Sequence, residues 1–431
     1  MDFKKLIEEY KDCPCGQKHE CKIEDIRVGS GITAEVGNIL TENHFPRRIL
    51  VVADEVTLAA AEGIQNALKD FSPEYLVYDS LRVATMTEVR RVKSYFSQGI
   101  DAVLAVGTGS VHDVCRKACA EADKKLCLYA TAPSMDGFAS YSAPIVDNGF
   151  KVTYEAKCPE VVIADTKVLA RAPGQLKSAG FGDMMAKYVA LIDWQVSRLI
   201  TGESYCSRVA DLTRFATDTV FAMADRVTAD DEETAKEIFS GLLLTGIAMS
   251  FTKTSRPGSG TEHIMAHYIE CKELLDGKTP NYHGEDVGVT TLLVLKLYDS
   301  ILDLDSVNAF PEQNDWPRIE KVYGPLAPEM KKLNTPDTIT DGISPALIRE
   351  NFDKIKEIVK SVPRYEEVLR KMRLAGCKTT YQEIGKPESL IKEAFLYHPY
   401  MRRRLPLRRL LNMTDVDPMR IFADPEIKQT K

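Results

Sequence analysis

Residues 101–122, DAVLAVGTGSVHDVCRKACAEA, decide the fold, because they join a strand, a glycine turn and a helix in one unit. The segment 101–109 predicts a strand that runs into the turn, and 110–122 predicts the helix that follows it. A unit of this kind is typical of an α/β domain built around a parallel sheet.

The flanking sequence repeats this alternation. Strands are predicted at 47–56, 75–78 and 125–134, and helices at 57–70 and 85–99, the latter ended by Gly99. Strands separated by single helices imply right-handed crossovers and a parallel sheet. Sheets of this type bind nucleotides at the carboxyl ends of their strands.

The pattern changes after this region. Two short apolar runs around Asp147-Asn148-Gly149 predict a hairpin, and 158–169 predicts one more strand and a connector. From about 176 the sequence is helical to its end. We therefore expect two domains: a Rossmann-like nucleotide-binding domain at 1–175 and a helical domain at 176–431.

Composition narrows the class of protein. The chain has 431 residues, which suits two or three domains. Its net charge of -7 argues against nucleic acid as the main partner. No run of about 18 apolar residues predicts a membrane span, and the start of the chain lacks the apolar core of a signal peptide. The ten scattered cysteines favour reduced thiols and a cytoplasmic location.

One cysteine cluster has two interpretations. Cys13, Cys15, His19 and Cys21 fall within nine positions and could hold zinc. The usual CxxC pair is absent, however, and a reduced, turn-rich segment is the alternative.

The glycine turn is the first candidate ligand site. Gly107, Gly109 and Ser110 lie where a strand passes into a helix, and the free N–H groups of a helix start suit a pyrophosphate. A tight turn without ligand is the alternative. Asp54 ends an earlier strand, where it could accept a hydrogen bond from a ribose hydroxyl or simply cap the next helix.

Three of the seven histidines predict a metal site. His263 and His267 are four residues apart, so they share one helix face, and His283 follows 16 residues later. Asp183 is predicted at the entry to a helix. Two imidazoles and a carboxylate suit zinc, nickel or ferrous iron. Core histidines and a helix-capping aspartate are the alternative.

Polar loops supply candidate substrate residues. The loop TAPSMDGFAS follows the strand at 125–134 and carries Thr131, Ser134, Asp136 and Ser140; an ordinary polar turn is the alternative.

Two basic stretches complete the candidate residues. In 255–263, Ser255, Arg256 and Ser259 could approach a phosphate, or the stretch could be a flexible linker. We interpret the basic run 401–409, MRRRLPLRR, as a solvated helix face or loop, with a phosphate or nucleic-acid role as the alternative.

Taken together and in order, six motifs resemble the sn-glycerol-1-phosphate dehydrogenases, within the superfamily of iron-containing alcohol dehydrogenases, glycerol dehydrogenases and dehydroquinate synthases. The resemblance covers about residues 12–410. The motifs are ADEVT (53–57), GTGSVHD (107–113), TAPSMDGFAS (131–140), GFGDMMAKYVALIDW (180–194), SRPGSGTEHIMAHYIE (255–270) and HGEDVGV (283–289). CPCGQKHE (13–20) looks like the bacterial branch.

The resemblance implies metal-dependent reduction of dihydroxyacetone phosphate to sn-glycerol 1-phosphate by NADH or NADPH, the metal acting as a Lewis acid on the carbonyl. It assigns NAD or NADP contacts to Asp54, Gly109, Ser110, Val111, His112, Asp113, Thr131, Ser134 and Ser140. It assigns the metal, zinc or nickel, to Asp183, His263 and His283, and substrate contacts to Asp136, Asp183 and His267. A small phosphorylated molecule is thus the expected partner, and a homo-oligomer is expected.

The chain departs from the superfamily pattern at one position. Thr108 stands in the glycine turn where a GGGS-type sequence is common, and it is tolerable there if its φ is negative. The choice between NADH and NADPH stays open. Three alternative functions remain: a glycerol dehydrogenase acting on an unphosphorylated polyol, a dehydroquinate-synthase-like lyase and a non-enzymatic sensor. For the lyase we find no dense set of basic residues near the metal residues.

Overall fold

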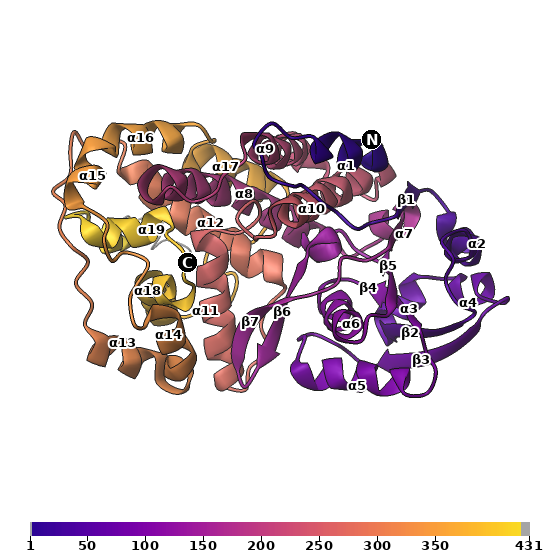
Figure 1. The fold of residues 1–431 in the computed structure, drawn as a ribbon. Helices are drawn as coiled ribbons and strands as arrows, with labels where there is room; N and C mark the ends of the chain where they lie inside the picture. Colours follow the sequence, from indigo (N-terminus) through magenta and orange to yellow (C-terminus); the bar gives the residue numbers. More distant parts are fainter. Residues whose placement is uncertain (1, 424–431) are drawn as a thin grey trace.

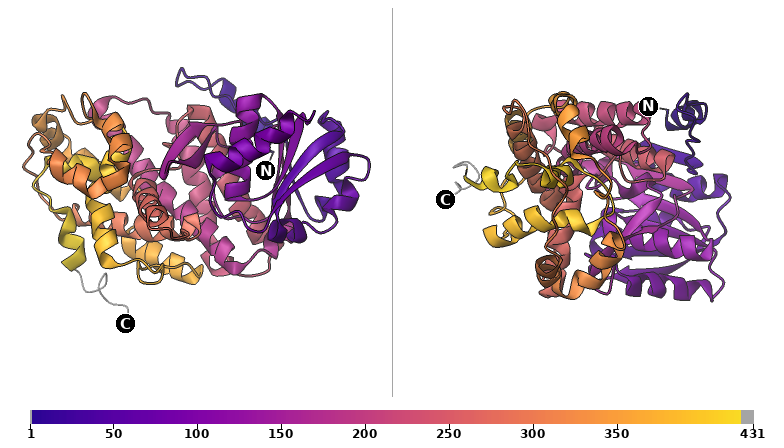
Figure 2. Two further views of the ribbon diagram at one scale, coloured as in Figure 1. Left: turned by 90° about the horizontal axis from the view of Figure 1, so that it is seen from below. Right: turned by 60° about the vertical axis from the view of Figure 1, so that its left-hand side comes forward.

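The computed structural model describes residues 2–423, which form a sheet half and a helical half side by side (Figures 1 and 2). In this described part a parallel sheet has the order β1-β8-β5-β4-β2-β3. Its strands are β1 Asp25–Gly29, β2 Arg48–Asp54, β3 Ser72–Tyr78, β4 Ala102–Gly107, β5 Lys125–Ala130 and β8 Val161–Asp165. The predicted α/β class is confirmed, and β1 is an edge strand that the sequence did not reveal.

Apolar residues bury both faces of the sheet. Along β2, Leu50 and Val52 face one core, which they share with the helices α5 (Met86–Phe96) and α6 (Gly109–Ala122). Ile49 and Val51 face the other core. This alternation is the period-two geometry of a strand covered on both sides. The helices of this half are α2 Val36–Glu42, α3 Glu55–Ala60, α4 Ile64–Ala67, α5 Met86–Phe96, α6 Gly109–Ala122 and α7 Thr166–Ala170.

The predicted helix at 57–70 is wrong as one piece. It breaks into α3 and α4 at Gly63, whose φ of 87° is left-handed and ends a helix. Gly99 takes the same conformation after α5, as predicted, with φ 85°.

The predicted hairpin is confirmed as β6 Ser142–Asp147 paired with β7 Phe150–Glu155. Asn148 and Gly149 both have positive φ, 50° and 78°, as a type I′ turn requires. The hairpin lies between the two halves (Figure 1) and contacts α6 on one side and α11, Thr261–Leu275, on the other.

The helical half is built around one long buried helix, α8. The principal helices are α8 Gly174–Thr201, α9 Ser207–Ala222, α10 Glu232–Thr252, α11 Thr261–Leu275 and α12 His283–Ser300. Shorter ones follow: α13 Trp316–Tyr323, α14 Ala327–Asn334, α15 Pro345–Glu350, α16 Phe352–Lys360, α17 Tyr365–Leu374, α18 Glu388–Tyr397 and α19 Leu407–Leu410. The first helix of the chain, α1 Phe3–Lys11, also packs on this half. Within the described residues no helix has the length and apolar character of a membrane span.

Glycines let α8 approach its neighbours closely. A Cβ atom added at Gly180 would lie 1.8 Å from the carbonyl oxygen of Pro133, in the loop after β5. A Cβ atom at Gly284, near the start of α12, would lie 1.9 Å from the carbonyl oxygen of Ala179. These contacts bring the loop after β5, α8 and α12 together at one place.

Gly180→Ala is therefore expected to destabilise the fold by about 1–3 kcal/mol, because backbone atoms rather than a flexible side chain must move. Gly174→Ala is the matched control in the same helix, since its Cβ would meet only Thr228 at 3.9 Å. Urea denaturation of both variants measures the difference. Equal stability of the two would show that the close approach is not required.

Candidate functional site

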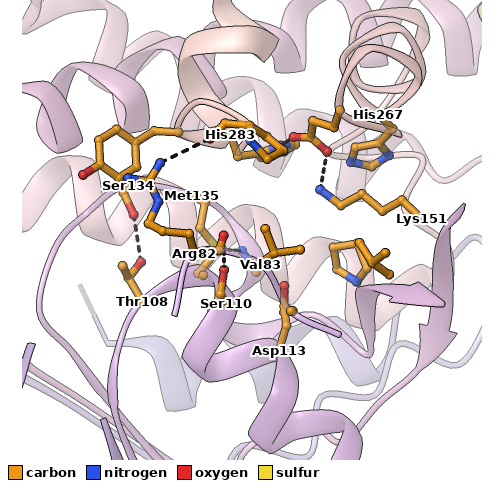
Figure 3. A pocket seen from close by; sticks show the side chains of 18 of the residues that line it. Arg82, Val83, Thr108, Ser110, Asp113, Ser134, Met135, Lys151, His267 and His283 are labelled. Atoms are coloured by element: carbon orange, nitrogen blue, oxygen red, sulfur yellow. Dashed lines mark hydrogen bonds and ion pairs between the residues drawn. The ribbon is translucent and has the colours of Figure 1, made fainter. Parts of the chain in front are cut away.

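A cavity of about 370 Å³ lies between the carboxyl ends of the strands and the helical half. Thr108, Ser110, Asp113 and Ser134 form one wall, with His267 and His283 across from them (Figure 3). The strand order reverses direction between β2 and β4, whose ends carry Asp54 and the glycine turn. Such a switch point is where α/β sheets bind ligands.

The start of α6 presents an open anion site to the cavity. Thr108 is the N-cap with φ -146°, so threonine is compatible with this turn. Within the described residues no side chain caps this helix end, because the Thr108 hydroxyl hydrogen-bonds Ser134 instead, at 2.8 Å. Gly109, Ser110 and Val111 line the cavity. Their free N–H groups and the helix dipole favour a phosphate group.

Asp54 both caps a helix and lines the cavity. Its Oδ1 accepts a hydrogen bond from the Thr57 N–H at 2.8 Å, and the Thr57 hydroxyl oxygen accepts one from the Asp54 N–H. These two bonds form a capping box at the start of α3. The capping interpretation is thus confirmed, and no interaction of the second carboxylate oxygen is found among residues 2–423.

The remaining cofactor candidates divide into two groups. Asp113 and Ser140 line the cavity. Burial raises the pKa of Asp113 to about 6, against the lowering effect of Arg116 and Lys151. His112 and Thr131 do not line it: His112 packs edge-on against Phe138 inside the core, where burial lowers its pKa to about 3. Helix geometry turns His112 toward the core, away from the face that carries Asp113.

Asp183, His263 and His283 come together from three helices. One ligand atom from each lies within 4.8 Å of the others, and Asp183 Oδ1 is 3.3 Å from His263 Nε2. The prediction that Asp183 lies at a helix entry is wrong, because α8 begins at Gly174 and Asp183 is fully buried within it. The helix-capping alternative for Asp183 is therefore excluded.

Carboxylates behind both histidines fix their rings. His263 Nδ1 is 2.7 Å from Glu262 Oε1, and His283 Nδ1 is 3.1 Å from Glu270 Oε1. Burial would lower the pKa of His263, but hydrogen bonds to Asp183 and Glu262 outweigh it and raise the pKa to about 9. A histidine whose Nδ1 faces a carboxylate is typical of metal sites, since Nε2 is left for the cation.

A second possible ligand set overlaps the first. His267, Glu270 and His283 also offer atoms within 4.8 Å of one another. Burial would raise the pKa of Glu270, but Lys151 and His283 hold it well below its usual range. Burial and Lys151 lower the pKa of His267, so its ring is neutral, and its Nε2 has no hydrogen-bond partner among residues 2–423. The cavity therefore contains an unpaired polar atom beside His283.

Lys187 is a central residue that the sequence reasoning missed. Its Nζ lies 2.6 Å from Asp183 Oδ1 and 2.7 Å from Asp136 Oδ2, with no exposed surface. The Asp136 backbone N–H also donates to Asp183 Oδ2, at 2.9 Å. The signal was present as a lysine four residues after Asp183, in an otherwise apolar part of the helix. Lys187 thus joins the loop after β5 to Asp183 of the carboxylate–histidine cluster.

Arg82 is another missed residue, on the loop between β3 and α5. Its guanidinium lies over the Tyr282 ring, 4.0 Å from the centroid, and donates to the Pro280 carbonyl at 3.4 Å. Its own carbonyl accepts the Ser110 hydroxyl, at 2.9 Å. Arg82 therefore connects the start of α6 to the segment before α12 along one side of the cavity (Figure 3).

The interpretation of 401–409 as a solvated stretch is wrong. Arg402 and Arg404 line the cavity, and Arg408 and Arg409 are buried. Arg404 donates to the Ser259 carbonyl at 3.0 Å and to the Ser255 hydroxyl. Burial and the positive charges of Arg256 and Arg402 lower the pKa of Arg404 to about 9, so it stays charged at neutral pH.

The predicted phosphate contacts at 255–259 need one correction. Ser255 and Ser259 line the cavity, but Arg256 turns away and pairs with Glu203, at 2.8 and 2.6 Å. The cation beside the two serines is Arg404 instead. Glu203 lies just before α9, 53 residues away from Arg256, so the local sequence around Arg256 does not show this partly exposed partner.

Substituting a buried and an exposed arginine of residues 401–409 should give different losses of stability. Arg409 holds Glu312 at 2.7 Å with no exposed surface, whereas Arg403 pairs with Asp337 in solvent. Arg409→Met is expected to destabilise the protein by about 3–5 kcal/mol, because Glu312 loses its partner inside the fold. Arg403→Met should cost less than about 1 kcal/mol. Urea denaturation measures the free energy of unfolding of both variants. An equally small loss in the two would support the interpretation of 401–409 as a solvated stretch.

Comparison with known proteins adds independent information. A family model described as iron-containing alcohol dehydrogenase matches residues 27–173. Glycerol-1-phosphate dehydrogenase [NAD(P)+] of Geobacillus thermodenitrificans is 30% identical over 396 residues, covering 90% of this chain and 92% of that protein. The protein of the same name from Thermococcus kodakarensis is 33% identical over 276 residues, 64% of this chain and 77% of that one.

Solved structures share the fold of both halves. A probable glycerol dehydrogenase from Sinorhizobium meliloti superposes with a TM-score of 0.63 at 15% identity, covering 93% of this chain and 94% of that one. The NADH-dependent butanol dehydrogenase A of Thermotoga maritima gives 0.60 at 14% identity, with 93% and 95% covered. At this identity the similarity concerns the arrangement of helices and strands.

Proposed function

The chain belongs to the glycerol-1-phosphate dehydrogenase family, and on that premise we propose that it reduces dihydroxyacetone phosphate to sn-glycerol 1-phosphate with NADH or NADPH. It is an oxidoreductase. One observation carries the finer proposal: the uncapped start of α6, the carboxylate–histidine cluster and two arginines, Arg402 and Arg404, border a single cavity. A hydride donor, a cation and a phosphorylated ketone would therefore meet in one place.

Asp183, His263 and His283 are proposed to hold the divalent metal. One carboxylate and two imidazoles suit zinc, nickel or ferrous iron and leave a position for substrate. When bound there, such a cation would stabilise the negative charge that develops on the ketone oxygen during hydride transfer. Glu262 and Glu270 hold the two rings in place from behind.

The sheet half is proposed to bind NAD or NADP. The N–H groups of Gly109, Ser110 and Val111 would bind its pyrophosphate at the start of α6. The Asp54 carboxylate oxygen that the capping box leaves unused would accept a hydrogen bond from a ribose hydroxyl. This arrangement supports the assignments of Asp113, Ser134 and Ser140, which line the same cavity.

Asp136, Lys187 and His267 are proposed to orient the ketone. Asp136 lines the cavity and accepts a hydrogen bond from a substrate hydroxyl, while the ion pair with Lys187 fixes the direction of its carboxylate. The neutral ring of His267 hydrogen-bonds a substrate oxygen through Nε2, the unpaired atom of the cavity. When bound, the reduced nicotinamide would supply a hydride to the carbonyl carbon, and a proton from solvent, passed on through His267, would reach the carbonyl oxygen and give the alcohol.

Arg402 and Arg404 are proposed to bind the substrate phosphate. Contacts to Lys151, Ser255 and Ser259 hold the two guanidiniums in fixed directions and leave further N–H donors unused. Charged, preoriented guanidiniums match the geometry of phosphate oxygens. These residues favour a phosphorylated ketone over an unphosphorylated polyol.

The amount of NADH consumed per turnover distinguishes the lyase alternative from the proposed reductase. Lys151, Arg402 and Arg404 do supply basic residues near the metal cluster, contrary to the expectation from sequence. A lyase that uses its nucleotide transiently consumes no net NADH, whereas the proposed reductase oxidises one molecule for each ketone. Absorbance of NADH during turnover decides between the two.

His263→Ala and His267→Ala test the metal assignment. His263→Ala should lose one equivalent of bound metal and at least about 1000-fold in kcat/KM, since several kcal/mol of charge stabilisation disappear. His267→Ala should keep the metal and lose about 10- to 100-fold, the cost of a hydrogen bond to a charged group. Metal analysis and kinetics on both variants provide the comparison. The reverse pattern would assign the metal to His267, Glu270 and His283.

Arg404→Met tests the phosphate assignment. The variant should lose about 10- to 100-fold in kcat/KM for dihydroxyacetone phosphate, because charge-assisted hydrogen bonds are removed. The rate with unphosphorylated dihydroxyacetone should hardly change. Arg403→Met, whose side chain pairs with Asp337 in solvent, is the matched control. Equal losses with both ketones would place Arg404 outside the phosphate site.

A further inference from the structure

A second cluster of metal-ligating side chains lies outside the cavity. Cys13, Cys15 and His19 from the segment after α1 meet Cys206, the N-cap residue of α9. We propose that these four residues bind a structural zinc ion that fastens the N-terminal segment to the helical half. Three thiols and an imidazole form one of the donor sets of closed structural zinc sites.

The distances suit a tetrahedral ion. Cys13 Sγ is 3.6 Å from Cys206 Sγ, and Cys15 Sγ is 3.1 Å from His19 Nε2. One atom from each of the four residues lies within 4.8 Å of the others. Zinc with thiolate sulfur at about 2.3 Å and imidazole nitrogen at about 2.0 Å separates its donors by about 3.5–3.8 Å. Small movements of the side chains would therefore complete the coordination.

His19 is already oriented as a ligand. It is fully buried, and its Nδ1 donates to the Phe251 carbonyl at 3.0 Å. This bond places the proton on Nδ1 and leaves the lone pair of Nε2 directed toward Cys15. A backbone carbonyl behind the ring is a common support for a zinc-bound histidine.

The ion would stabilise a connection that has little structure of its own. Residues 12–24 contain neither helix nor strand, and they lead from α1 on the helical half to β1 in the sheet (Figure 1). Tyr10 stacks on Phe251, with centroids 4.9 Å apart, and its hydroxyl donates to the Arg208 carbonyl. A cross-link here reduces the conformational freedom of the segment.

The membership of the cluster differs from the sequence prediction. Cys21 is not part of it, because its thiol lies 3.8 Å from Cys158 instead. Cys206, from a distant part of the chain, provides the fourth donor. Thiolates are soft ligands that select zinc, so this site is chemically distinct from the carboxylate–histidine cluster of the cavity.

Zinc analysis in the His263→Ala background tests the site apart from the proposed function. With the cavity metal removed, one zinc per chain should remain. Adding Cys15→Ser should remove it, whereas adding Cys21→Ser should not. The same zinc content in the Cys15→Ser and Cys21→Ser proteins would overturn the proposal. Failure of the cavity assignment would show instead as two metals remaining in His263→Ala.

Cobalt substitution gives a second measurement that does not depend on turnover. The cobalt protein should show a thiolate-to-cobalt charge-transfer band that is lost in Cys15→Ser and Cys206→Ser and kept in Cys21→Ser. Intact mass under denaturing, non-reducing conditions should show free thiols. A mass lower by two hydrogens, mapped to a Cys13–Cys206 disulfide, would overturn the proposal. Removal of zinc should lower the melting temperature only in proteins that retain all four ligands.

Discussion

The buried ammonium of Lys187 between Asp136 and Asp183 is the interaction on which the site depends. Lys187 and Asp183 have no exposed side-chain surface, and Asp136 borders the cavity. Burying an ion costs several kcal/mol unless it is paired. Lys187 pairs with both carboxylates, and the Asp136 N–H completes the bonding of Asp183. The network fixes the loop after β5 against α8 at the place where glycines allow their backbones to approach.

The cavity takes its chemistry from opposite sides. The sheet contributes an uncapped helix start, which attracts anionic phosphates. The helices contribute a carboxylate with two histidines, and the segment after α18 contributes Arg402 and Arg404. Under the proposed function each side would bind a different part of the reacting pair, so the cofactor and the ketone would meet only when both halves are folded against each other. The hairpin β6–β7 helps to hold that geometry, since Lys151 contacts both Glu270 and Arg402.

The fold was largely predictable because its signals are local. Continuous apolar runs marked the inner strands, and Asn148-Gly149 marked the hairpin. The edge strand β1 escaped notice because DIRVG is short and only half-buried. Of the site, the cluster of Asp183, His263 and His283 was anticipated by residue type and motif, and the structure brings those side chains together. Lys187, Arg82 and Cys206 were missed because their partners are distant or buried.

The sequence by itself determined the parallel sheet, the glycine turn and the residue types for a cation and a phosphate, since each follows from neighbouring residues. Only the tertiary structure decided which cations face the cavity. Arg256 turns to Glu203 and Arg404 replaces it, while Arg408 and Arg409 are buried. A charged side chain goes wherever a partner can offset the loss of water, and that partner is a property of the folded chain rather than of the local sequence.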